Sequence, residues 1–267
     1  MRARRWAAWA ILAAFASFAL LPAYWMVLTA TRRQADIYSL SPLPWPLSLE
    51  SFTIAWQQLD LPRLVLNTAV VATGAAALQL LVATLAAYGL CALTPRWQTA
   101  ATFAFYGAWL VPVQVVMLPN FLLLSRLGLL ETLAGVIAPT IISGFAVVLL
   151  REHIGAIPRQ LLSAARLDGL GPMATLIQVV LPNVRAGLSS VGIVLFIAAW
   201  NDYFWPALVL RRGEGVLQLG MRSFMTSEGT NWGPLMAVAV LACLPALVLY
   251  AALQRHIVDA LVRSGLK

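Results

Sequence analysis

The sequence contains little charge and very little acid. Only 10% of its 267 residues are charged, with ten Asp and Glu against eighteen Lys and Arg, whereas an ordinary soluble domain carries roughly 25% charged residues. Hydrophobic residues make up 61% of the chain, and the mean hydropathy is +0.83. This composition excludes a soluble enzyme, a disordered tail and a repeat solenoid. It predicts a multi-pass protein embedded in a lipid bilayer.

The chain has only two cysteines and two histidines, and it lacks a nucleotide-binding loop. The two cysteines, Cys91 and Cys243, lie inside apolar stretches, which excludes a disulfide framework and a metal site and predicts packing residues. No GxxxxGK[ST] loop occurs, so the chain cannot hydrolyse ATP through that machinery. The net charge of +8 would suggest nucleic acid in a soluble protein. Here the basic residues gather at the ends of apolar runs, which indicates membrane orientation and no nucleic-acid partner.

Charge-free apolar runs divide the chain into membrane spans. A helix needs about 20 apolar residues to cross the hydrocarbon core, and six runs satisfy this condition. The first run follows three arginines, but it is too long for a signal-peptide core and lacks a small-residue cleavage site. The predicted fold class is an all-α polytopic membrane protein, with 1–267 forming a single transmembrane domain. The expected spans are about 6–30, 64–90, 99–123, 132–150, 187–209 and 234–254.

The distribution of basic residues predicts the orientation, because Lys and Arg accumulate in cytoplasmic loops. With a cytoplasmic N-terminus, eleven basic residues fall inside and seven outside, so we expect both termini in the cytoplasm. Three connections are long. Residues 31–63 and 210–233 form the outer segments, and residues 151–186 form a cytoplasmic loop between spans 4 and 5.

The cytoplasmic loop has proline and glycine residues at positions typical of the ends of short helices. Pro158 suits the first turn of a helix, and Gly169 stands where a helix end favours positive φ. Gly171-Pro172 predicts a break, and Met173 to Val180 predicts a second short helix that ends before Pro182. The pattern predicts a helix–turn–helix elbow, which is equally typical of a connector lying on the membrane surface.

Two motifs in this half of the chain carry a resemblance. Ala164-Ala165-Arg166-Leu167-Asp168-Gly169, followed by Leu181-Pro182, resembles the EAA loop of ABC importer permeases. Trp200-Asn201-Asp202-Tyr203-Phe204-Trp205-Pro206 resembles the WNDxxWP signature of their fifth span. Over nearly its whole length the chain resembles the second permease subunit of maltose-, trehalose- or glycerol-phosphate-type importers. Other matching pieces are Asn67-Thr68, Val111-Pro112, Leu118-Pro119, Leu127-Gly128-Leu129-Leu130, Asn231-Trp232-Gly233, Leu244-Pro245 and Gln254-Arg255.

The resemblance implies a non-enzymatic permease of the bacterial cytoplasmic (inner) membrane. It implies an ATP-driven importer in which this chain forms half of the pathway for a sugar or glycerol-phosphate-type solute. The 158–170 loop would dock as a coupling helix onto a cytoplasmic ATPase dimer, which holds ATP and Mg while this chain binds no cofactor. The other implied partners are a homologous second permease, an extracytoplasmic solute-binding protein and the lipid bilayer. The expected ATPase contacts are Arg159, Ser163, Ala164, Ala165, Arg166, Asp168 and Gly169.

One of these positions departs from the motif. The family has a glutamate where this chain has Ser163, and a charge-assisted hydrogen bond is stronger than a neutral one. The departure therefore bears on the strength or partner specificity of docking. The small alanines and the glycine turn remain, so the shape of the loop is expected to be preserved.

Polar residues of the apolar runs are expected to face the protein interior, because exposure to lipid is costly. Asp202 is the only acid within an expected span and lies among aromatic residues, which suit sugar rings. The same aromatics are typical of the membrane interface, so structural anchoring competes with substrate contact. The expected pathway residues are Asn67, Gln114, Asn120, Trp200, Asn201, Asp202 and Tyr203, with Gln79 as a further polar position. The expected binding-protein contacts, in the polar and glycine-containing second outer loop, are Gly213, Glu214, Gly215 and Arg222.

Three alternatives stay open. An ion-coupled secondary transporter would need acids or His in several helices, or inverted repeats, and only Asp202 meets this condition. A membrane enzyme would need a Ser/His, HExxH or paired-carboxylate constellation, which the sequence lacks. A scaffold subunit whose partner makes the substrate contacts fits the sequence as well. The sequence leaves the solute open, because Arg211, Arg212 and Arg222 suit either a phosphate-bearing solute or an acidic binding protein.

Overall fold

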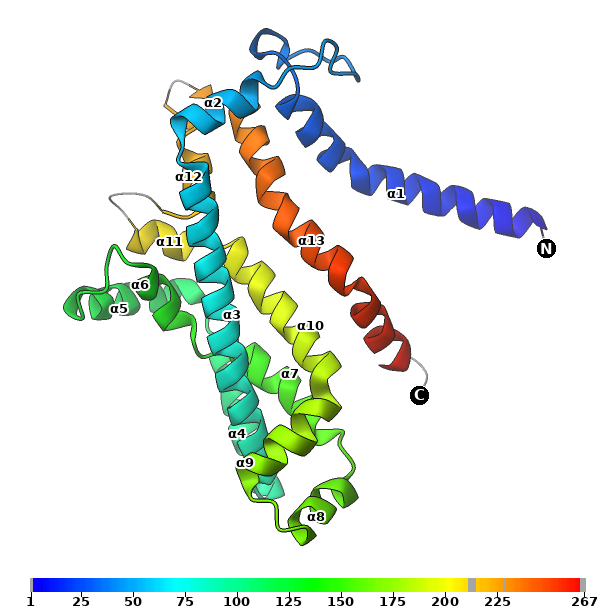
Figure 1. The fold of residues 1–267 in the computed structure, drawn as a ribbon, viewed down its shortest axis with the longest axis vertical. Helices are drawn as coiled ribbons and strands as arrows, with labels where there is room; N and C mark the ends of the chain where they lie inside the picture. The colour runs from blue at the N-terminus through cyan, green and yellow to red at the C-terminus, as the bar shows by residue number, and fades with distance from the viewer. Residues whose placement is uncertain (1, 211–214, 228, 265–267) are drawn as a thin grey trace. The chain divides into compact units, whose positions relative to one another are not determined.

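The computed structural model describes residues 2–210, 215–227 and 229–264, and these are almost entirely helical (Figure 1). The sheet of the described residues is one antiparallel pair, β1 (Met225–Thr226) and β2 (Gly229–Thr230). The all-α fold class is therefore confirmed. The chain forms two compact units, of which unit 1 comprises Met1–Val65 and Val216–Leu247, and unit 2 comprises Leu66–Gly215 and Val248–Lys267.

Unit 1 contains the first helix, α1 (Arg2–Ala30), the first of the two expected outer segments and most of the second. Pro22 lies inside α1 without ending it, which is typical of membrane helices. The guanidinium of the buried Arg32 donates to the backbone carbonyls of Ser39 and Ser41 and lies 5.5 Å from the ring centroid of Trp25. These contacts tie the first outer segment to the end of α1. The helices that lie in or enter this unit are α1 (Arg2–Ala30), η1 (Gln34–Asp36), α2 (Glu50–Gln58), α3 (Leu61–Ala92), α12 (Leu217–Arg222) and α13 (Trp232–Ser264).

Unit 2 has a core between three helices, α3, α7 (Gly144–Gly155) and α10 (Leu181–Trp200). Small residues on α3, such as Ala83 and Ala87, are fully buried against branched residues of the other two helices, such as Leu150 and Val191. Small side chains let membrane helices approach closely. The helices of this unit after α3 are α4 (Pro95–Leu110), α5 (Val113–Arg126), α6 (Leu133–Ile137), η2 (Ala138–Thr140), α7 (Gly144–Gly155), α8 (Arg159–Leu167), α9 (Pro172–Thr175), the π-helical turn η3 (Leu176–Val180), α10 (Leu181–Trp200) and α11 (Phe204–Val209).

Three helical stretches of the described residues are long and apolar enough to cross a membrane alone: Ala8–Ala30, Leu61–Ala92 and Pro172–Trp200. Two bent helix pairs raise the number to five if each pair is one span. The third expected span, about 99–123, is not one straight helix, because α4 (Pro95–Leu110) and α5 (Val113–Arg126) meet at an angle of 86°. Pro112 causes this break, since it lacks a backbone N–H and holds the preceding Val111 in extended backbone with ψ of 121°.

Pro182, unlike Pro112, does not interrupt its helix. The expected helix end before Pro182 is wrong, because α9, η3 and α10 continue from Pro172 to Trp200 as one candidate span. Pro182 lies in the first turn of α10, where a missing N–H is tolerated. The π-helical turn that precedes it adjusts the backbone, and the Asn183 side-chain amide donates to the carbonyl of Val179 at 2.7 Å.

Candidate functional site

Helix α8 has one face on the core of unit 2 and one face exposed. Ala165 is 4% exposed, and Leu162 packs against the buried cluster of α3, α7 and α10. Ala165 therefore positions the helix instead of presenting a contact surface. The other predicted contact residues are exposed: Arg159, Ser163, Ala164, Arg166, Asp168 and Gly169.

The C-terminal end of α8 is closed by local hydrogen bonds. Gly169 has a φ of 80°, as predicted from its position. Its N–H donates to Arg166 O at 3.1 Å, and the N–H of Leu170 donates to Ala165 O at 3.0 Å. This pattern is a Schellman motif, which satisfies the last carbonyls of the helix and favours glycine at the left-handed position.

The helices on either side of α8 are fixed to the rest of unit 2. The hydroxyl of Tyr88 on α3 donates to the carbonyl of Pro172, the first residue of α9, at 3.1 Å. Gly187 of α10 lies against the ring of His153 near the end of α7, where a Cβ atom would come within 2.6 Å of the ring. A movement of α8 would therefore reach α3, α7 and α10 through packed contacts.

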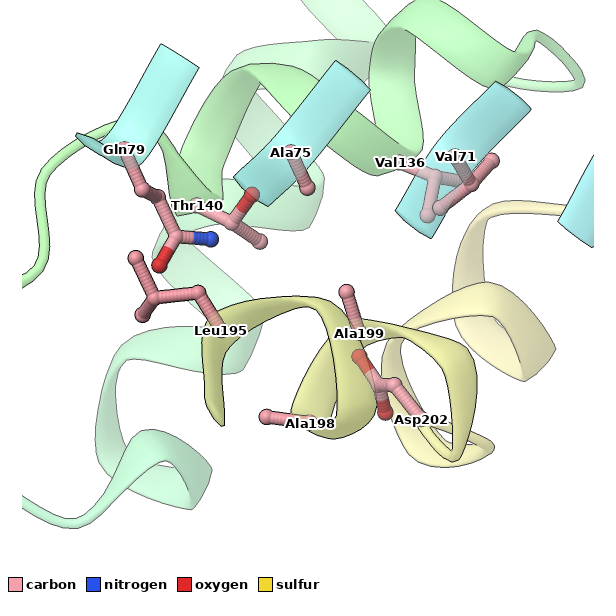
Figure 2. Close-up of a pocket in the computed structure, with 9 residues that line it drawn as sticks. All are labelled: Val71, Ala75, Gln79, Val136, Thr140, Leu195, Ala198, Ala199 and Asp202. Atoms are coloured by element: carbon pink, nitrogen blue, oxygen red, sulfur yellow. The ribbon is translucent and has the colours of Figure 1, made fainter. Parts of the chain in front are cut away.

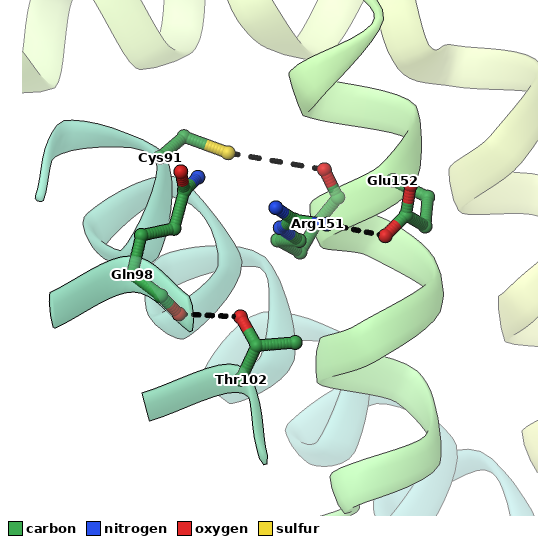
Figure 3. Close-up of polar contacts among 5 residues, drawn as sticks. All are labelled: Cys91, Gln98, Thr102, Arg151 and Glu152. Carbon is green, nitrogen blue, oxygen red and sulfur yellow. Dashed lines mark hydrogen bonds and ion pairs between the residues drawn. The ribbon is translucent and has the colours of Figure 1, made fainter. Parts of the chain in front are cut away.

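Polar contacts also surround the last turns of α7 (Figure 3). The Cys91 thiol donates to the carbonyl of Arg151 with a sulfur–oxygen distance of 3.8 Å, and Arg151 pairs with Glu152. On α4, the Thr102 hydroxyl donates to the carbonyl of Gln98 at 2.7 Å. Besides the packing role predicted for it, Cys91 thus forms a weak hydrogen bond that links α3 to α7.

A second candidate site is a pocket of about 250 Å³ between α3, the α6–η2 segment and the end of α10. Gln79 and Thr140 supply polar groups toward one end of the pocket in Figure 2, and Asp202 lies toward the other. The remaining walls are small or branched apolar side chains. Such a mixture of apolar walls and few polar groups is typical of small-molecule sites. The other lining residues are Val71, Ala75, Val136, Leu195, Ala198 and Ala199.

The fifth expected span ends earlier than the sequence predicted. Helix α10 stops at Trp200, and α11 begins at Phe204, so Asp202 lies in a turn. Its carboxylate accepts a hydrogen bond from the backbone N–H of Trp205 at 3.4 Å. The Trp205 indole N–H donates to Val136 O at 3.1 Å. The WNDxxWP motif therefore holds the turn between two helices and places Asp202 at the pocket.

The residues next to Asp202 in the sequence lie in different environments. Trp200 is buried and stacks on Phe196 with ring centroids 5.7 Å apart. The exposed Asn201 donates its side-chain amide to Ile197 O at 2.9 Å. Tyr203 makes an edge contact with Phe204 at 5.7 Å between ring centroids. Of the aromatic and polar cluster expected in the pathway, only Asp202 lines this pocket.

The other residues expected in the pathway, which are distant in the sequence, also lie away from this pocket. The Asn67 side-chain amide donates to Gly215 O at 3.1 Å, and Gln114 and Asn120 lie on α5 and do not line the pocket. Thr140 is a lining residue that the sequence reasoning missed. Its signal was a hydroxyl directly after Pro139 within an apolar run.

The residues expected to contact a binding protein are distributed differently. Gly215 is buried, and Arg222 is exposed at the end of α12. Gly213 and Glu214 lie outside the described residues.

Comparison with known proteins identifies the class. The model of the family described as "Binding-protein-dependent transport system inner membrane component" matches residues 79–263. The chain belongs to this family of ABC transporter permeases, which confirms the resemblance seen in its motifs. It is a multi-pass protein of the inner membrane.

Individual relatives agree with this assignment. The lactose transport system permease protein LacG of Rhizobium radiobacter is 28% identical over 254 residues, covering 95% of this chain and 92% of LacG. The sn-glycerol-3-phosphate transport system permease protein UgpE of Rhizobium meliloti (strain 1021) is 30% identical over 208 residues, covering 77% of this chain and 74% of UgpE. A solved bacterial ABC transporter involved in the import of alginate shares the fold, with a TM-score of 0.81 at 22% identity, covering 95% of this chain and 96% of that one.

Proposed function

We propose that this chain is one of two permease subunits of an ATP-driven importer and docks on a cytoplasmic ATPase dimer through residues 158–170. The solute is a sugar or a glycerol-phosphate-type molecule, delivered by an extracytoplasmic binding protein. Support comes from the family and from relatives named for lactose, sn-glycerol-3-phosphate and arabinooligosaccharide transport. The 158–170 segment is called the coupling segment below.

The observation that carries the proposal is the exposed face of α8. Leu167 is 89% exposed and Leu161 is 41% exposed, beside polar residues of the same short helix. Exposed apolar side chains rimmed by polar ones are typical of a protein–protein contact. Leu161 and Leu167 are six residues apart and point in directions about 120° apart around the helix. The fitting partner is therefore a groove that encloses α8, covers both leucines and pairs with Arg159, Arg166 or Asp168.

The construction of the coupling segment suits the transmission of movement. Helix α8 contacts α9 and η3, its Leu162 packs against the buried hydrophobic cluster of unit 2, and its C-terminal turn is closed by the Schellman motif. When ATP closes the ATPase dimer, α8 moves as a rigid element and carries the helices on either side with it. Such domain motion is the usual means by which a transporter alternates between two states. The loaded binding protein favours one state by binding it more tightly.

The proposed topology has six spans and two cytoplasmic termini. Each bent pair forms one span, and α1, α3 and Pro172–Trp200 form three more. Helix α13 supplies the sixth through its apolar stretch Trp232–Val248. In this topology residues 31–63 and 210–233 lie outside, where Arg222 is proposed to contact the binding protein, and the coupling segment lies in the cytoplasm.

The pocket of Asp202 is the proposed contribution of this chain to the solute path. Gln79, Thr140 and Asp202 provide an amide, a hydroxyl and a carboxylate beside apolar walls. These groups suit the hydroxyls of a polyol or sugar. In the ion-coupled alternative Asp202 would bind the coupling cation, so the two proposals differ in whether uptake needs ATP.

The test is co-purification of the chain, expressed with its neighbouring genes, in mild detergent, followed by mass spectrometry and an ATPase assay. We expect a second permease and an ATPase to be recovered, with turnover raised by loaded binding protein. Gly169→Pro should abolish that stimulation, because proline cannot adopt a φ of 80° and cannot donate the bond to Arg166 O.

The matched control is Gly128→Pro. Gly128 has a φ of 68° and closes the end of α5 with the same pair of hydrogen bonds, so this variant applies similar backbone damage away from the coupling segment. The complex assembled with the Gly128→Pro chain should keep an ATPase turnover that loaded binding protein stimulates. Recovery of the chain alone, or transport into liposomes without ATP, would contradict the proposal and favour the ion-coupled alternative.

A further inference from the structure

Two neighbouring pockets of unit 1 share Tyr38 as a lining residue, and together we call them the outer groove. The first has a volume of about 340 Å³ and is lined by the aromatic side chains Trp25, Tyr38 and Trp232. The second has a volume of about 480 Å³, and polar groups of Gln58, Thr230 and Asn231 line it. An aromatic half thus adjoins a polar half.

The aromatic half presents ring surface to a ligand. Trp25 and Trp232 are 43% and 41% exposed, and Tyr38 is 79% exposed. Aromatic rings have a large apolar face with a polar atom at the edge, which suits the C–H face of a sugar ring and its hydroxyls. The first pocket is also lined by Thr29 and Ser39, which carry hydroxyl groups.

The wall that carries Tyr38 is fixed in place before any ligand binds. Arg32 is 2% exposed, and its guanidinium donates to the carbonyls of Ser39 and Ser41. The hydroxyl of Tyr24 donates to the carbonyl of Pro42. These contacts hold the backbone at Ser39 and directly after it, next to Tyr38, so binding does not incur the entropy cost of ordering this part of the wall.

The polar half offers neutral hydrogen-bonding groups. Two of its hydroxyls are already engaged, since Ser223 donates to Gly220 O at 2.8 Å and Thr226 donates to Gly229 O at 3.0 Å. The backbone N–H of Asn231 donates to Phe224 O at 2.9 Å, which fixes the position of that residue. Gln58, Thr230 and Asn231 therefore supply amide and hydroxyl groups to a ligand.

The chemistry of the lining selects among solutes. Among the described residues, no Lys, Arg, Asp or Glu lines either half. A phosphate or an acidic sugar would require cationic partners when desolvated, whereas a neutral sugar requires apolar faces and neutral hydrogen bonds. A lipid chain would use the aromatic half alone and would gain nothing from Gln58, Thr230 and Asn231.

We infer that the outer groove binds a neutral sugar, with a ring stacked on Tyr38 and its hydroxyls bonded to Gln58, Thr230 and Asn231. The inference rests on the proposed function and deepens it, because it narrows the solute class to neutral glycosides. It also assigns a sugar-binding step to residues other than those around Asp202.

The test measures sugar binding to the purified complex in lipid nanodiscs, without ATP and without binding protein. Ligand-observed saturation-transfer NMR with lactose and maltose should detect binding, and glycerol 3-phosphate should give no signal. Tyr38→Ala should weaken sugar binding about ten-fold through the loss of the stacked ring, and Tyr38→Phe should retain most of it. Asn231→Ala should also weaken it.

Trp45→Ala is the matched control, because Trp45 is an 85% exposed aromatic of the same outer segment that does not line the groove. Sugar binding that is absent from the wild-type complex, unchanged in Tyr38→Ala, or weaker than glycerol 3-phosphate binding would overturn the inference. A lipid that native mass spectrometry finds on the wild type and not on Trp232→Ala, without sugar binding, would overturn it as well.

Failure of the proposed function gives a different result. In that case the chain purifies without an ATPase, or Gly169→Pro leaves turnover unchanged. Sugar binding does not depend on either outcome. It would then be measured on the chain purified by itself, with the same variants deciding the inference.

Discussion

The coupling segment and the pocket of Asp202 are built in different ways within unit 2. The coupling segment is closed by hydrogen bonds between near neighbours, such as Leu170 to Ala165, and it has one buried face. The pocket combines α3, the α6–η2 segment and the turn after α10. It depends on contacts between distant parts of the chain, such as the bond from the Trp205 indole to Val136 O.

This difference determines how each region should respond to substitution. Exposed residues of the coupling segment can change without loss of the fold, so their effects should appear in ATPase docking. Residues that hold the pocket are shared with the packing of unit 2, so their effects should appear first in stability. Substitutions in each region therefore test this contrast.

Trp205→Ala should have the largest effect. Trp205 is 6% exposed and joins α11 to α6, and replacing a buried large aromatic with alanine costs about 3–5 kcal/mol. Trp205→Phe keeps most of the ring volume but leaves the Val136 carbonyl without its donor, which costs about 1–3 kcal/mol. Thermal unfolding of the purified protein should rank the two in this order. Equal melting temperatures for both variants and the wild type would show that the turn does not depend on this contact.

Ala165→Leu should have the next largest effect on stability. Ala165 is 4% exposed, and extra methylene groups in a packed site cost about 1–3 kcal/mol. Ala164 is its exposed neighbour, so Ala164→Leu should leave the melting temperature unchanged while it reduces co-purification of the ATPase. If Ala164→Leu unfolds the protein and Ala165→Leu does not, the assignment of the two faces of α8 is reversed.

The same contrast explains what could be predicted from the sequence. Gly169 was placed correctly because a helix end that requires positive φ is a local property. Asp202 lines a pocket, but its place in a turn was missed, because the apolar run of the sequence continues through a helix end. Thr140 was missed because its approach to Gln79 results from the packing of α3 against the α6–η2 segment, which a single sequence does not encode in any short pattern.

The two prolines illustrate the same limit. Pro112 and Pro182 both occur in apolar runs, and both have the local chemistry of a helix boundary. Pro112 ends α4 with a sharp bend, whereas the helix continues through Pro182 after the π-helical turn. Residue type alone does not separate these outcomes, because the second depends on how the preceding five residues pack against the core of unit 2.

Asp202→Asn tests the pocket without disturbing its turn. Asn accepts the bond from the Trp205 N–H nearly as well as Asp, so stability should change by less than about 0.5 kcal/mol. If Asp202 contacts the solute, the KM for ATP-driven uptake into liposomes should rise several-fold with the maximal rate nearly unchanged. An unaltered KM would show that Asp202 does not contact the solute. If an ion gradient drives uptake by the wild type and Asp202→Asn abolishes that uptake, the ion-coupled alternative is favoured.

Ser163→Glu should have the smallest effect on stability and a measurable effect on docking. Ser163 is exposed on α8, and an acid there would lie one helical turn from Arg159 and Arg166, which stabilises a helix by about 0.2–0.5 kcal/mol per pair. The family motif has glutamate at this position, and a carboxylate forms stronger hydrogen bonds than a hydroxyl. If the ATPase of this importer presents a basic residue there, Ser163→Glu should tighten its binding, measured by titration of ATPase onto the permease complex.

Ser163→Gln separates charge from size in the same titration. It should leave ATPase affinity near that of the wild type if the carboxylate is what the partner recognises. If Ser163→Glu weakens binding while Ser163→Gln does not, the partner presents a neutral or acidic surface, and the serine then contributes to partner specificity. Equal affinities for all three proteins would place position 163 outside the contact and leave Leu161 and Leu167 as its apolar anchors.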